Sequence, residues 1–443
     1  MTHRPPAGRT LKVDALARVE GEGALYVETR DGAVVDVQLK IYEPPRFFEA
    51  FLRGRSYTEP PDITARVCGI CPVAYQMSAC LAIEDACGVT VGGPLRDLRR
   101  LLYCGEWIES HTLHIYLLHA PDFLGYESAV DLARDRRDLV ETGLELKKLG
   151  NHLVEVIGGR AVHPVNVRVG GFYRLPTLRE RRSLRGELER ARDLAVATVR
   201  VVAGFDAPDL THHHAYLALS RPDEYAVMGG DVLLDDGTTF PVADVPRHVV
   251  EEHVAHSTAL HAHLADERGE YLVGPMARFA LGFDRLRPVA REIAAEVGIG
   301  PDERNPFRSI VVRAVEVVHA CDEALALLDA YAEPDAPAVE VPPRAGVGHG
   351  ATEAPRGLLY HRYELADDGT VLDAVMMPPT AQNQPGIEHD LFHLVEANID
   401  RPTAELTALC EQAIRNHDPC ISCATHFLDL VIEEVGDDGG VVG

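Results

Sequence analysis

Residues 66–72 read RVCGICP and residues 418–426 read DPCISCATH, which places one Cys-x-x-Cys pair near each end of the 443-residue chain. Small zinc modules keep their two cysteine pairs close together in the sequence. Here only a fold that brings both ends of the chain together can join the four thiols in one site, namely Cys68, Cys71, Cys420 and Cys423. We therefore predict a metal centre buried inside the fold.

The composition narrows the class of protein. The chain is 46% hydrophobic and 25% charged, which is typical of a soluble globular protein. Its net charge of −26 argues against nucleic acid and anionic membranes as partners. It has no apolar run as long as a membrane span, and its first residues, MTHRPPAGRT, lack the hydrophobic core of a secretion signal. We expect a cytoplasmic protein, in which an odd number of cysteines, nine, favours metal or catalytic use over a disulfide framework. The five cysteines outside the two pairs are interpreted as small buried hydrophobic residues.

Hydrophobic periodicity predicts a mainly α-helical α+β fold, a long helical bundle with small peripheral β-sheets or hairpins. Alternating apolar residues flank Asp31-Gly32, and a similar pattern surrounds Asp368-Gly369. Glycine accepts the positive φ of a tight turn, so both patterns predict β-hairpins. The helical period occupies residues 95–120, 131–158, 178–203, 282–298, 309–332 and 402–416.

We interpret residues 1–426 as a single large domain and residues 427–443 as a C-terminal extension. The run His212-His213-His214 is interpreted as a feature of a loop. The domain is expected to contain an N-terminal β-hairpin region, a mainly helical region, a loop and hairpin segment, and a helix with the C-terminal metal motif, at residues 10–45, 46–332, 333–400 and 401–426.

The spacing of the cysteines alone leaves the metal open. Two thiolate pairs suit zinc, an iron–sulfur cluster or the softer coordination of nickel. A structural zinc and a catalytic metal fit this spacing equally well, so the flanking residues have to decide between them.

The flanking residues resemble the two signatures of the nickel–iron hydrogenase large subunit, R-x-C-G-x-C and D-P-C-x-x-C-x-x-H. Further family elements follow in the family's order at residues 17–21 (ARVEG), 110–116 (SHTLHIY), 158–164 (GGRAVHP) and 353–357 (EAPRG). The wording CPVAYQ and NHDPCISCATHF is most similar to the soluble cytoplasmic members of the NADP-linked sulfhydrogenase alpha-subunit type. Complexes of that type exchange electrons with NADP(H) and sometimes reduce sulfur.

The resemblance implies a nickel–iron centre that cleaves H2 heterolytically. Cys68 and Cys420 would be terminal nickel ligands, and Cys71 and Cys423 would bridge nickel to an iron that carries carbonyl and cyanide ligands. Thiolates keep nickel electron-rich. Cys420 would take the proton and Glu20 would be the first carboxylate of its exit path; without the family context, Glu20 reads as a solvated residue beside a strand.

The resemblance also assigns residues around the iron ligands. Arg356 would donate hydrogen bonds to one cyanide, and Asp418 would pair with it so that neither charge is buried alone. Thr380 would donate to a second cyanide, although Pro379 is an alternative register for that position. Without the motif, Arg356 reads as one half of a surface salt bridge.

A second, harder ion, magnesium or iron, would be held by Glu49, His426 and the backbone carbonyl near Val375. Four further residues would surround the centre without binding metal, namely Tyr75, Pro355, His111 and His163. Tyr75 stands where the family often has histidine, which puts the tuning of the centre in doubt but not its ligands.

The resemblance implies several partners. The chain has no electron-transfer cluster of its own. Electrons would therefore pass to an Fe–S small subunit and then to flavin and NAD(P) diaphorase subunits. Nickel-insertion proteins and a maturation protease would act first, the protease cutting after His426 to remove residues 427–443. The alternative is a permanent tail.

Three rival functions remain at this point. The same fold could serve a deazaflavin or NAD as acceptor. It could be a hydrogen sensor, against which the tail after His426 counts. It could be a structural zinc or complex-assembly protein, against which the four cysteines in their family context count.

Overall fold

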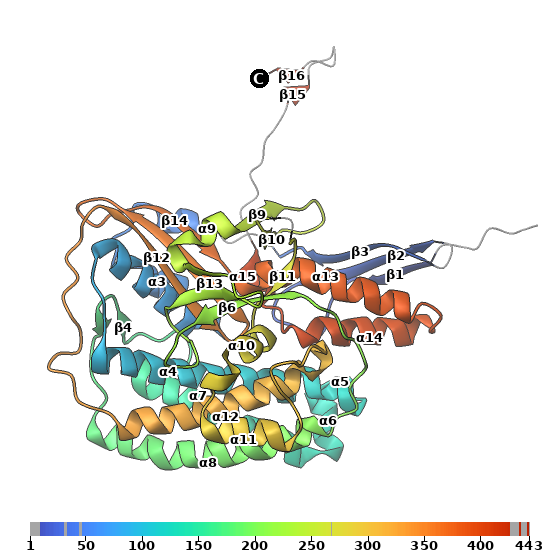
Figure 1. Ribbon diagram of the computed structural model, residues 1–443, viewed down its shortest axis with the longest axis horizontal. Helices are drawn as coiled ribbons and strands as arrows, with labels where there is room; N and C mark the ends of the chain where they lie inside the picture. Colours follow the sequence, from blue (N-terminus) through green and yellow to red (C-terminus); the bar gives the residue numbers. More distant parts are fainter. Residues whose placement is uncertain are drawn as a thin grey trace, which may run out of the picture.

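The computed structural model describes residues 9–30, 33–43, 47–266, 268–425, 434–435 and 441–442. The predicted turn at Asp31-Gly32 and the predicted ligand His426 lie outside these residues. Figure 1 shows a lower layer of long helices, an upper layer of short sheets and helices, and a three-stranded sheet that extends to one side.

The lower layer is an amphipathic helix bundle. Its long members are α4 (Gly93–Leu113), α7 (Arg137–Gly158), α8 (Leu178–Ala203) and α12 (Ser309–Asp329). A capping box of Thr177 and Glu180 starts α8, because each side chain bonds the backbone N–H of the other residue. A Cβ atom on Gly150 would lie 2.7 Å from Glu109 N, so only glycine permits the close approach of α7 to α4.

Shorter helices complete this layer. A π-helical turn, η1 (His114–His119), continues α4. The remaining members are α5 (Ala120–Leu124), α6 (Ala129–Asp135), α10 (Pro275–Gly282) and α11 (Pro288–Glu296), with 3-10 turns η3 (Phe283–Arg285) and η4 (Pro306–Arg308).

The upper layer positions both cysteine pairs. Helix α3 (Pro72–Cys87) lies across the antiparallel sheet β12-β13-β14 (Gly346–Ala354, Gly357–Leu365, Val371–Met377). A Cβ atom on Gly348 would lie 2.0 Å from Ala82 O, so glycine lets this sheet touch the helix backbone. The helices beside the sheet are α1 (Phe48–Leu52), α2 (Pro60–Thr64), α13 (Pro379–Ala397), α14 (Thr403–Asn416) and α15 (Ile421–Ala424).

The other strands form small sheets. Antiparallel β1-β2-β3 (Arg9–Val13, Gly23–Arg30, Ala33–Ile41) pairs Leu25 with Leu39. A four-stranded sheet has the order β11-β6-β7-β8 (Tyr271–Leu272, Ala215–Ser220, Asp231–Leu234, Thr239–Pro241). Two-stranded pairs are β9-β10 (Val249–His253, Leu260–Leu264), β4-β5 (Val167–Arg168, Gly171–Phe172) and β15-β16 (Glu434–Val435, Val441–Val442). Two short helices, η2 (Val242–Asp244) and α9 (Val245–His248), precede β9.

The predicted fold class is confirmed. Each predicted helical stretch contains a helix, and strands pair on both sides of Asp368-Gly369 as expected. Two features go beyond the prediction: residues 215–272 hold strands β6 to β11, and α13 lies within the segment expected to be loop and hairpin. Among the described residues, none of the helices is both long and apolar enough to cross a membrane.

Candidate metal centre

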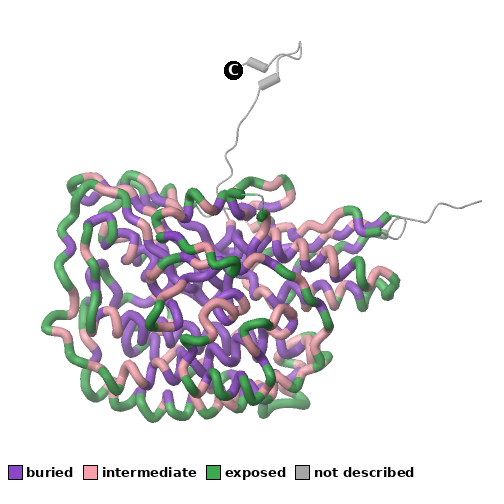
Figure 2. The backbone as a smooth tube through the Cα atoms, viewed as in Figure 1, coloured by how far each residue is buried: buried purple, intermediate pink, exposed green. Residues whose placement is uncertain are grey.

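The two cysteine pairs meet, as the sequence predicts, in the buried interior that Figure 2 shows. The four ligand sulfur atoms lie within 4.8 Å of one another, and each cysteine is at most 8% exposed. The Sγ atoms of Cys68 and Cys420 are 3.4 Å apart, those of Cys71 and Cys423 are 3.8 Å apart, and those of Cys420 and Cys423 are 2.7 Å apart. Each end of the chain therefore contributes one pair of cysteines to the same cluster.

Local capping holds each pair in place. Cys71 precedes α3, whose first residue, Pro72, has no N–H to satisfy. The buried carboxylate of Glu106 on α4 accepts hydrogen bonds from the N–H groups of Val73 at 2.6 Å and Ala74 at 3.0 Å. Both N–H groups belong to the first turn of α3 and have no partner within the helix, so Glu106 fixes the start of α3 beside the first pair.

The second pair is held from α13. The Cys420 N–H donates to Thr380 Oγ1 at 2.9 Å, in the first turn of α13. Asp418 has φ of 51°, a left-handed conformation that is uncommon outside glycine and that aspartate tolerates better than most residues. The chain thereby turns at Asp418 just before Cys420.

The thiols are not equivalent. Burial raises the pKa of Cys420 well above its ordinary value and also raises the pKa of Cys423. The pKa of Cys68 is held well below its ordinary value by hydrogen bonds from Cys420 first and then from the other two thiols. Without a metal, the cluster would therefore share protons around one thiolate, and a bound cation would replace those protons.

Arg356 and Asp418 form a buried ion pair beside the cluster, as the resemblance implies. Arg356 lies in the turn between β12 and β13, and both residues are at most 3% exposed. Its Nε donates to Asp418 O at 2.7 Å and its Nη2 to Asp418 Oδ1 at 3.0 Å. Among the described residues, Arg356 Nη1 has no hydrogen-bond partner.

A small cavity borders Arg356. Thr380 and three of the four cysteines are also among its lining residues. A buried donor without a protein partner costs free energy unless a ligand accepts from it. Soft thiolates, an unused cationic donor and an adjoining small cavity fit a nickel–iron centre with small anionic iron ligands, whereas a four-cysteine structural zinc needs neither the donor nor the space.

Glu20 reaches the cluster from the N-terminal segment. Cys420 Sγ donates to Glu20 Oε2 at 3.1 Å, and the Ser422 N–H donates to the same oxygen at 3.0 Å. The Ile421 N–H donates to the Glu20 carbonyl at 2.9 Å, which closes a parallel bridge between Glu20 and Cys420. Ser422 Oγ in turn donates to the partly exposed Glu43 at 2.9 Å.

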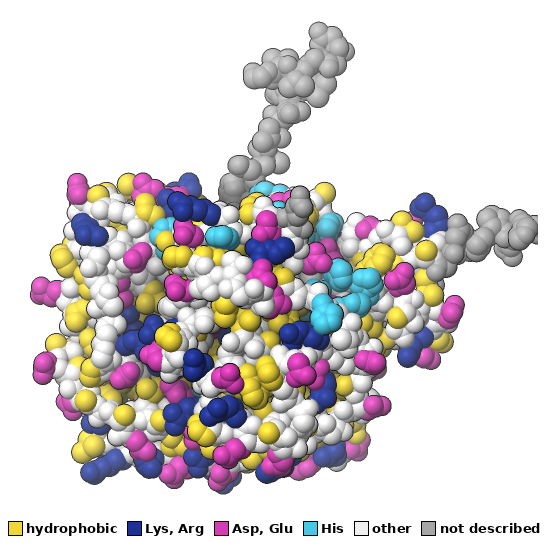
Figure 3. Space-filling view, viewed as in Figure 1, with side chains coloured by type: hydrophobic (Ala, Val, Ile, Leu, Met, Phe, Trp, Pro, Cys, Tyr) yellow, Lys and Arg dark blue, Asp and Glu magenta, His cyan; other side chains and the backbone are white. Residues whose placement is uncertain are grey.

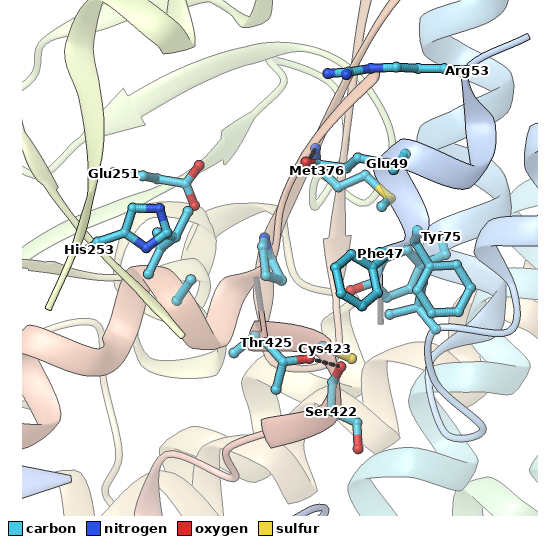
Figure 4. A pocket seen from close by; sticks show the side chains of 17 residues that line it. Phe47, Glu49, Arg53, Tyr75, Glu251, His253, Met376, Ser422, Cys423 and Thr425 are labelled. Carbon is cyan, nitrogen blue, oxygen red and sulfur yellow. Dashed lines mark hydrogen bonds between the residues drawn. The ribbon is translucent and has the colours of Figure 1, made fainter. Parts of the chain in front are cut away.

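Glu49 lines the cavity of about 400 Å³ drawn in Figure 4, which Cys423 also lines. Its Oε1 accepts the Met376 N–H at 2.7 Å, which puts the carboxylate next to Val375. Figure 4 shows Glu49, Met376 and Tyr75 facing Glu251 and His253 across the cavity, with Cys423 and Thr425 below. Glu49 thus contacts the backbone of β14 directly after Val375, and the third predicted ligand, His426, lies outside the described residues.

The remaining predicted residues occupy distinct places around the centre. Tyr75 lines both cavities, and burial raises its pKa well above the ordinary value. His111 Nε2 lies 2.9 Å from Glu316 Oε2, and burial lowers the pKa of His111 to about 4. His163 Nδ1 donates to Ala65 O at 2.7 Å, which holds the segment before the first pair.

Sequence reasoning missed a buried ionic network that supports Arg356. Arg278 donates to the carbonyls of Ala354 at 2.8 Å and Pro355 at 2.9 Å, and it pairs with Glu316 and Glu353. Glu353 also accepts the Leu219 N–H at 2.7 Å, and burial raises its pKa to about 7. The signal available in the sequence was the charge of Arg313 and Glu316 within the otherwise apolar stretch 310–318 of α12.

The fold and the site define the catalytic chain of a thiolate-ligated hydrogenase, and comparisons agree. The family model for nickel-dependent hydrogenase matches residues 46–142. The chain is 34% identical to the alpha subunit of sulfhydrogenase 1 from Pyrococcus furiosus, over 95% of this chain and 98% of that protein. The alpha subunit of sulfhydrogenase 2 from the same organism is 31% identical, over 95% of this chain and all of that protein.

Solved structures give the same result. An NAD+-reducing [NiFe]-hydrogenase in the H2-reduced state matches with a TM-score of 0.85 and 28% identity, over 94% of this chain and 99% of that chain. The Ni-Fe-Se hydrogenase from D. vulgaris Hildenborough matches in fold, with a TM-score of 0.77 and 22% identity, over 95% of this chain and all of that chain. The chain belongs to the nickel–iron hydrogenase large-subunit family, so the predicted resemblance is confirmed.

Proposed function

We propose that this protein cleaves H2 reversibly into protons and electrons, with Cys68 and Cys420 as terminal nickel ligands and Cys71 and Cys423 as bridges to iron. The observation that carries the proposal is the buried four-thiol cluster with Glu20 on one side and the unsatisfied Arg356 donor on the other. When bound, the nickel–iron centre supplies the soft, electron-rich metal that polarises H2 and accepts its electrons. The protein residues supply the acid–base chemistry and the dry pocket.

The proton leaves through Cys420. Its Sγ is 3.1 Å from Glu20 Oε2, a distance that permits direct proton transfer without an intervening water. The Ser422 N–H holds the receiving oxygen in place. From Glu20 the proton moves toward solvent along the side occupied by Ser422 and Glu43, because Glu43 is the next carboxylate and is partly exposed.

The residues that line the small cavity would hold the iron ligands. Arg356 would donate through Nη1 to one cyanide, while Asp418 holds the guanidinium by two hydrogen bonds. Thr380 Oγ1 accepts from the Cys420 N–H, which would leave its own hydrogen free for a second cyanide. Glu49, the Val375 carbonyl and His426 would hold a magnesium or iron ion beside the centre.

The electrons pass to an Fe–S small subunit, then on to NAD(P), in the cytoplasm. The support is a set of relatives that includes two sulfhydrogenase alpha subunits and one chain of an NAD-reducing hydrogenase. Relatives named as F420-non-reducing hydrogenases keep the acceptor question open between NAD(P) and other carriers. Nickel-insertion proteins load the site, and a protease then removes residues 427–443.

Infrared spectroscopy with metal analysis tests this function. Complex produced with its maturation proteins should contain nickel and iron and show bands from iron-bound carbonyl and cyanide. Zinc alone, without those bands, would establish a structural zinc site and end the proposal. Assays of the same preparation with NADP+, NAD+ and a deazaflavin identify the acceptor, and slow turnover with all of them would favour a hydrogen sensor. Intact mass of the active chain decides whether residues 427–443 are removed.

A further inference from the structure

A second group of metal-binding side chains lies outside the thiolate centre, where α13 meets the loop before β6. His212 belongs to that loop, and His389 and His393 are one helical turn apart on α13. One nitrogen from each ring lies within 4.8 Å of the other two. All three residues are partly exposed, and Figure 3 shows histidine side chains gathered on this face. An ion from solution can therefore reach them.

The spacing on α13 is itself suited to chelation. Two histidines at positions i and i+4 project from the same face of a helix and can bind one ion. The ring centroids of His389 and His393 are 4.6 Å apart, and those of His212 and His393 are 4.4 Å apart. The loop thus adds a third imidazole to a pair that the helix already presents.

A carboxylate lies against one of the rings. His389 Nδ1 lies 2.9 Å from Glu270 Oε1, while the exposed Glu396 carboxylate lies 3.5 Å from His393 Nδ1. A carboxylate on one ring nitrogen fixes the tautomer and leaves the other nitrogen as a metal donor. Glu270 can act in this way on His389, as carboxylates do on histidines that bind metals.

The electrostatics also favour a cation. Burial lowers the pKa of His212 and of His389, and neighbouring histidines act in the same direction. At neutral pH, protons therefore compete only weakly with a metal ion for the ring nitrogens. Behind the cluster, the buried carboxylate of Asp390 accepts hydrogen bonds from His214 Nε2 at 2.7 Å and His417 Nε2 at 3.0 Å.

We infer that His212, His389 and His393 form a binding site for one divalent transition-metal ion of the zinc and nickel class. Imidazole ligands select zinc, nickel, copper or iron over magnesium and calcium. Zinc–nitrogen bonds of about 2.1 Å place two ring nitrogens about 3.4 Å apart, so rotations of the side chains suffice to close the site. A fourth position would face solvent. Binding would tie the loop to the helix whose first turn carries Thr380.

Zinc retention by the matured complex tests the inference. The complex is treated with a chelator, supplied with zinc, freed of unbound ion and analysed for zinc per chain. Wild type should retain one more zinc ion than His393→Ala. The matched control is His213→Ala, because His213 is exposed, neighbours His212 and does not belong to the cluster. This control should retain as much zinc as wild type.

Two results would overturn the inference. Equal zinc in wild type and His393→Ala would show that the cluster binds no ion. A zinc ion that persists in His393→Ala but disappears in Glu388→Gln would place it at the separate group His256, His261 and Glu388. Cobalt provides a second readout, since its d–d absorption should appear in wild type and be absent in His393→Ala. Unchanged H2 oxidation in His393→Ala shows that the variant is folded.

Discussion

Replacing Glu20 with glutamine isolates the proton step. In Glu20→Gln the amide oxygen still accepts the Ser422 N–H at the 3.0 Å position of the carboxylate oxygen, so the local backbone should keep its place. The amide cannot receive the proton that Cys420 delivers across 3.1 Å. A positioned acid or base contributes roughly 10²- to 10⁴-fold in rate, which corresponds to about 3–5 kcal/mol of barrier. We expect H2/D2O isotope exchange to fall by that factor while the nickel and iron content stays at the wild-type level.

The control is Glu22→Gln, which removes an exposed carboxylate two positions away that does not contact Cys420. It should exchange at the wild-type rate. The reasoning is refuted if Glu20→Gln exchanges as fast as this control, since the proton would then leave Cys420 by another route. A variant that loses nickel would instead show that Glu20 is needed to assemble the site, and the infrared bands separate these two cases.

Three further predictions concern stability and follow from burial. Arg356→Ala should lower the free energy of unfolding by about 3–5 kcal/mol because it leaves a buried carboxylate unpaired. Arg200→Ala breaks an exposed pair and should change the free energy of unfolding much less; denaturant titration measures both. Gly150→Ala should destabilise the fold by about 1–3 kcal/mol, because its new Cβ atom would meet the α4 backbone. The control Gly186→Ala lies in open space on α8 and should be neutral or stabilising. Thermal unfolding measures both variants. Burial raises the pKa of Glu353 to about 7, so the folded state holds this proton more tightly than the unfolded state. The free energy of unfolding should therefore fall as pH rises from about 4.5 to about 7. Glu353→Gln should remove that part of the pH dependence, and an unchanged pH dependence would contradict the raised pKa of Glu353.

The sequence predicted the fold wherever one physical pattern dominated. The helices of the lower layer carry a clear apolar period, and their bounds agree closely with the structure. Helix α13 was not predicted, because Pro385 interrupts it and polar residues such as Gln382 and Asn383 are buried on it. Those amides are satisfied by distant strands: Gln382 donates to Leu358 O at 2.6 Å, and Asn383 accepts the Val273 N–H at 2.9 Å. Local periodicity cannot report such long-range hydrogen bonds.

The residues of the site likewise fall into those that the sequence predicted and those that it could not predict. The cysteines, Arg356 and Asp418 were predictable because the resemblance fixes their positions in the sequence, and the structure brings them together. Glu106 and Arg278 belong to no pattern that the sequence displays. Each acts on backbone groups far away in the chain, Glu106 on the start of α3 and Arg278 on the turn before Arg356. Residues that hold a site by capping backbone atoms can be found only once the fold is known.

The distance between Glu20 and Cys420 depends on how the two ends of the chain are joined. Arg18 has φ of 58° and donates to Leu118 O at 2.7 Å, and its guanidinium pairs with Asp122. Arg415, at the end of α14, donates to the same carboxylate at 2.7 and 2.8 Å and to Ala17 O at 2.8 Å. Asp122 therefore fastens both the segment that carries the proposed proton acceptor and the helix that leads to the thiol. Because the two segments share that anchor, the proposed proton transfer between them would be a property of the closed fold and not of either motif alone.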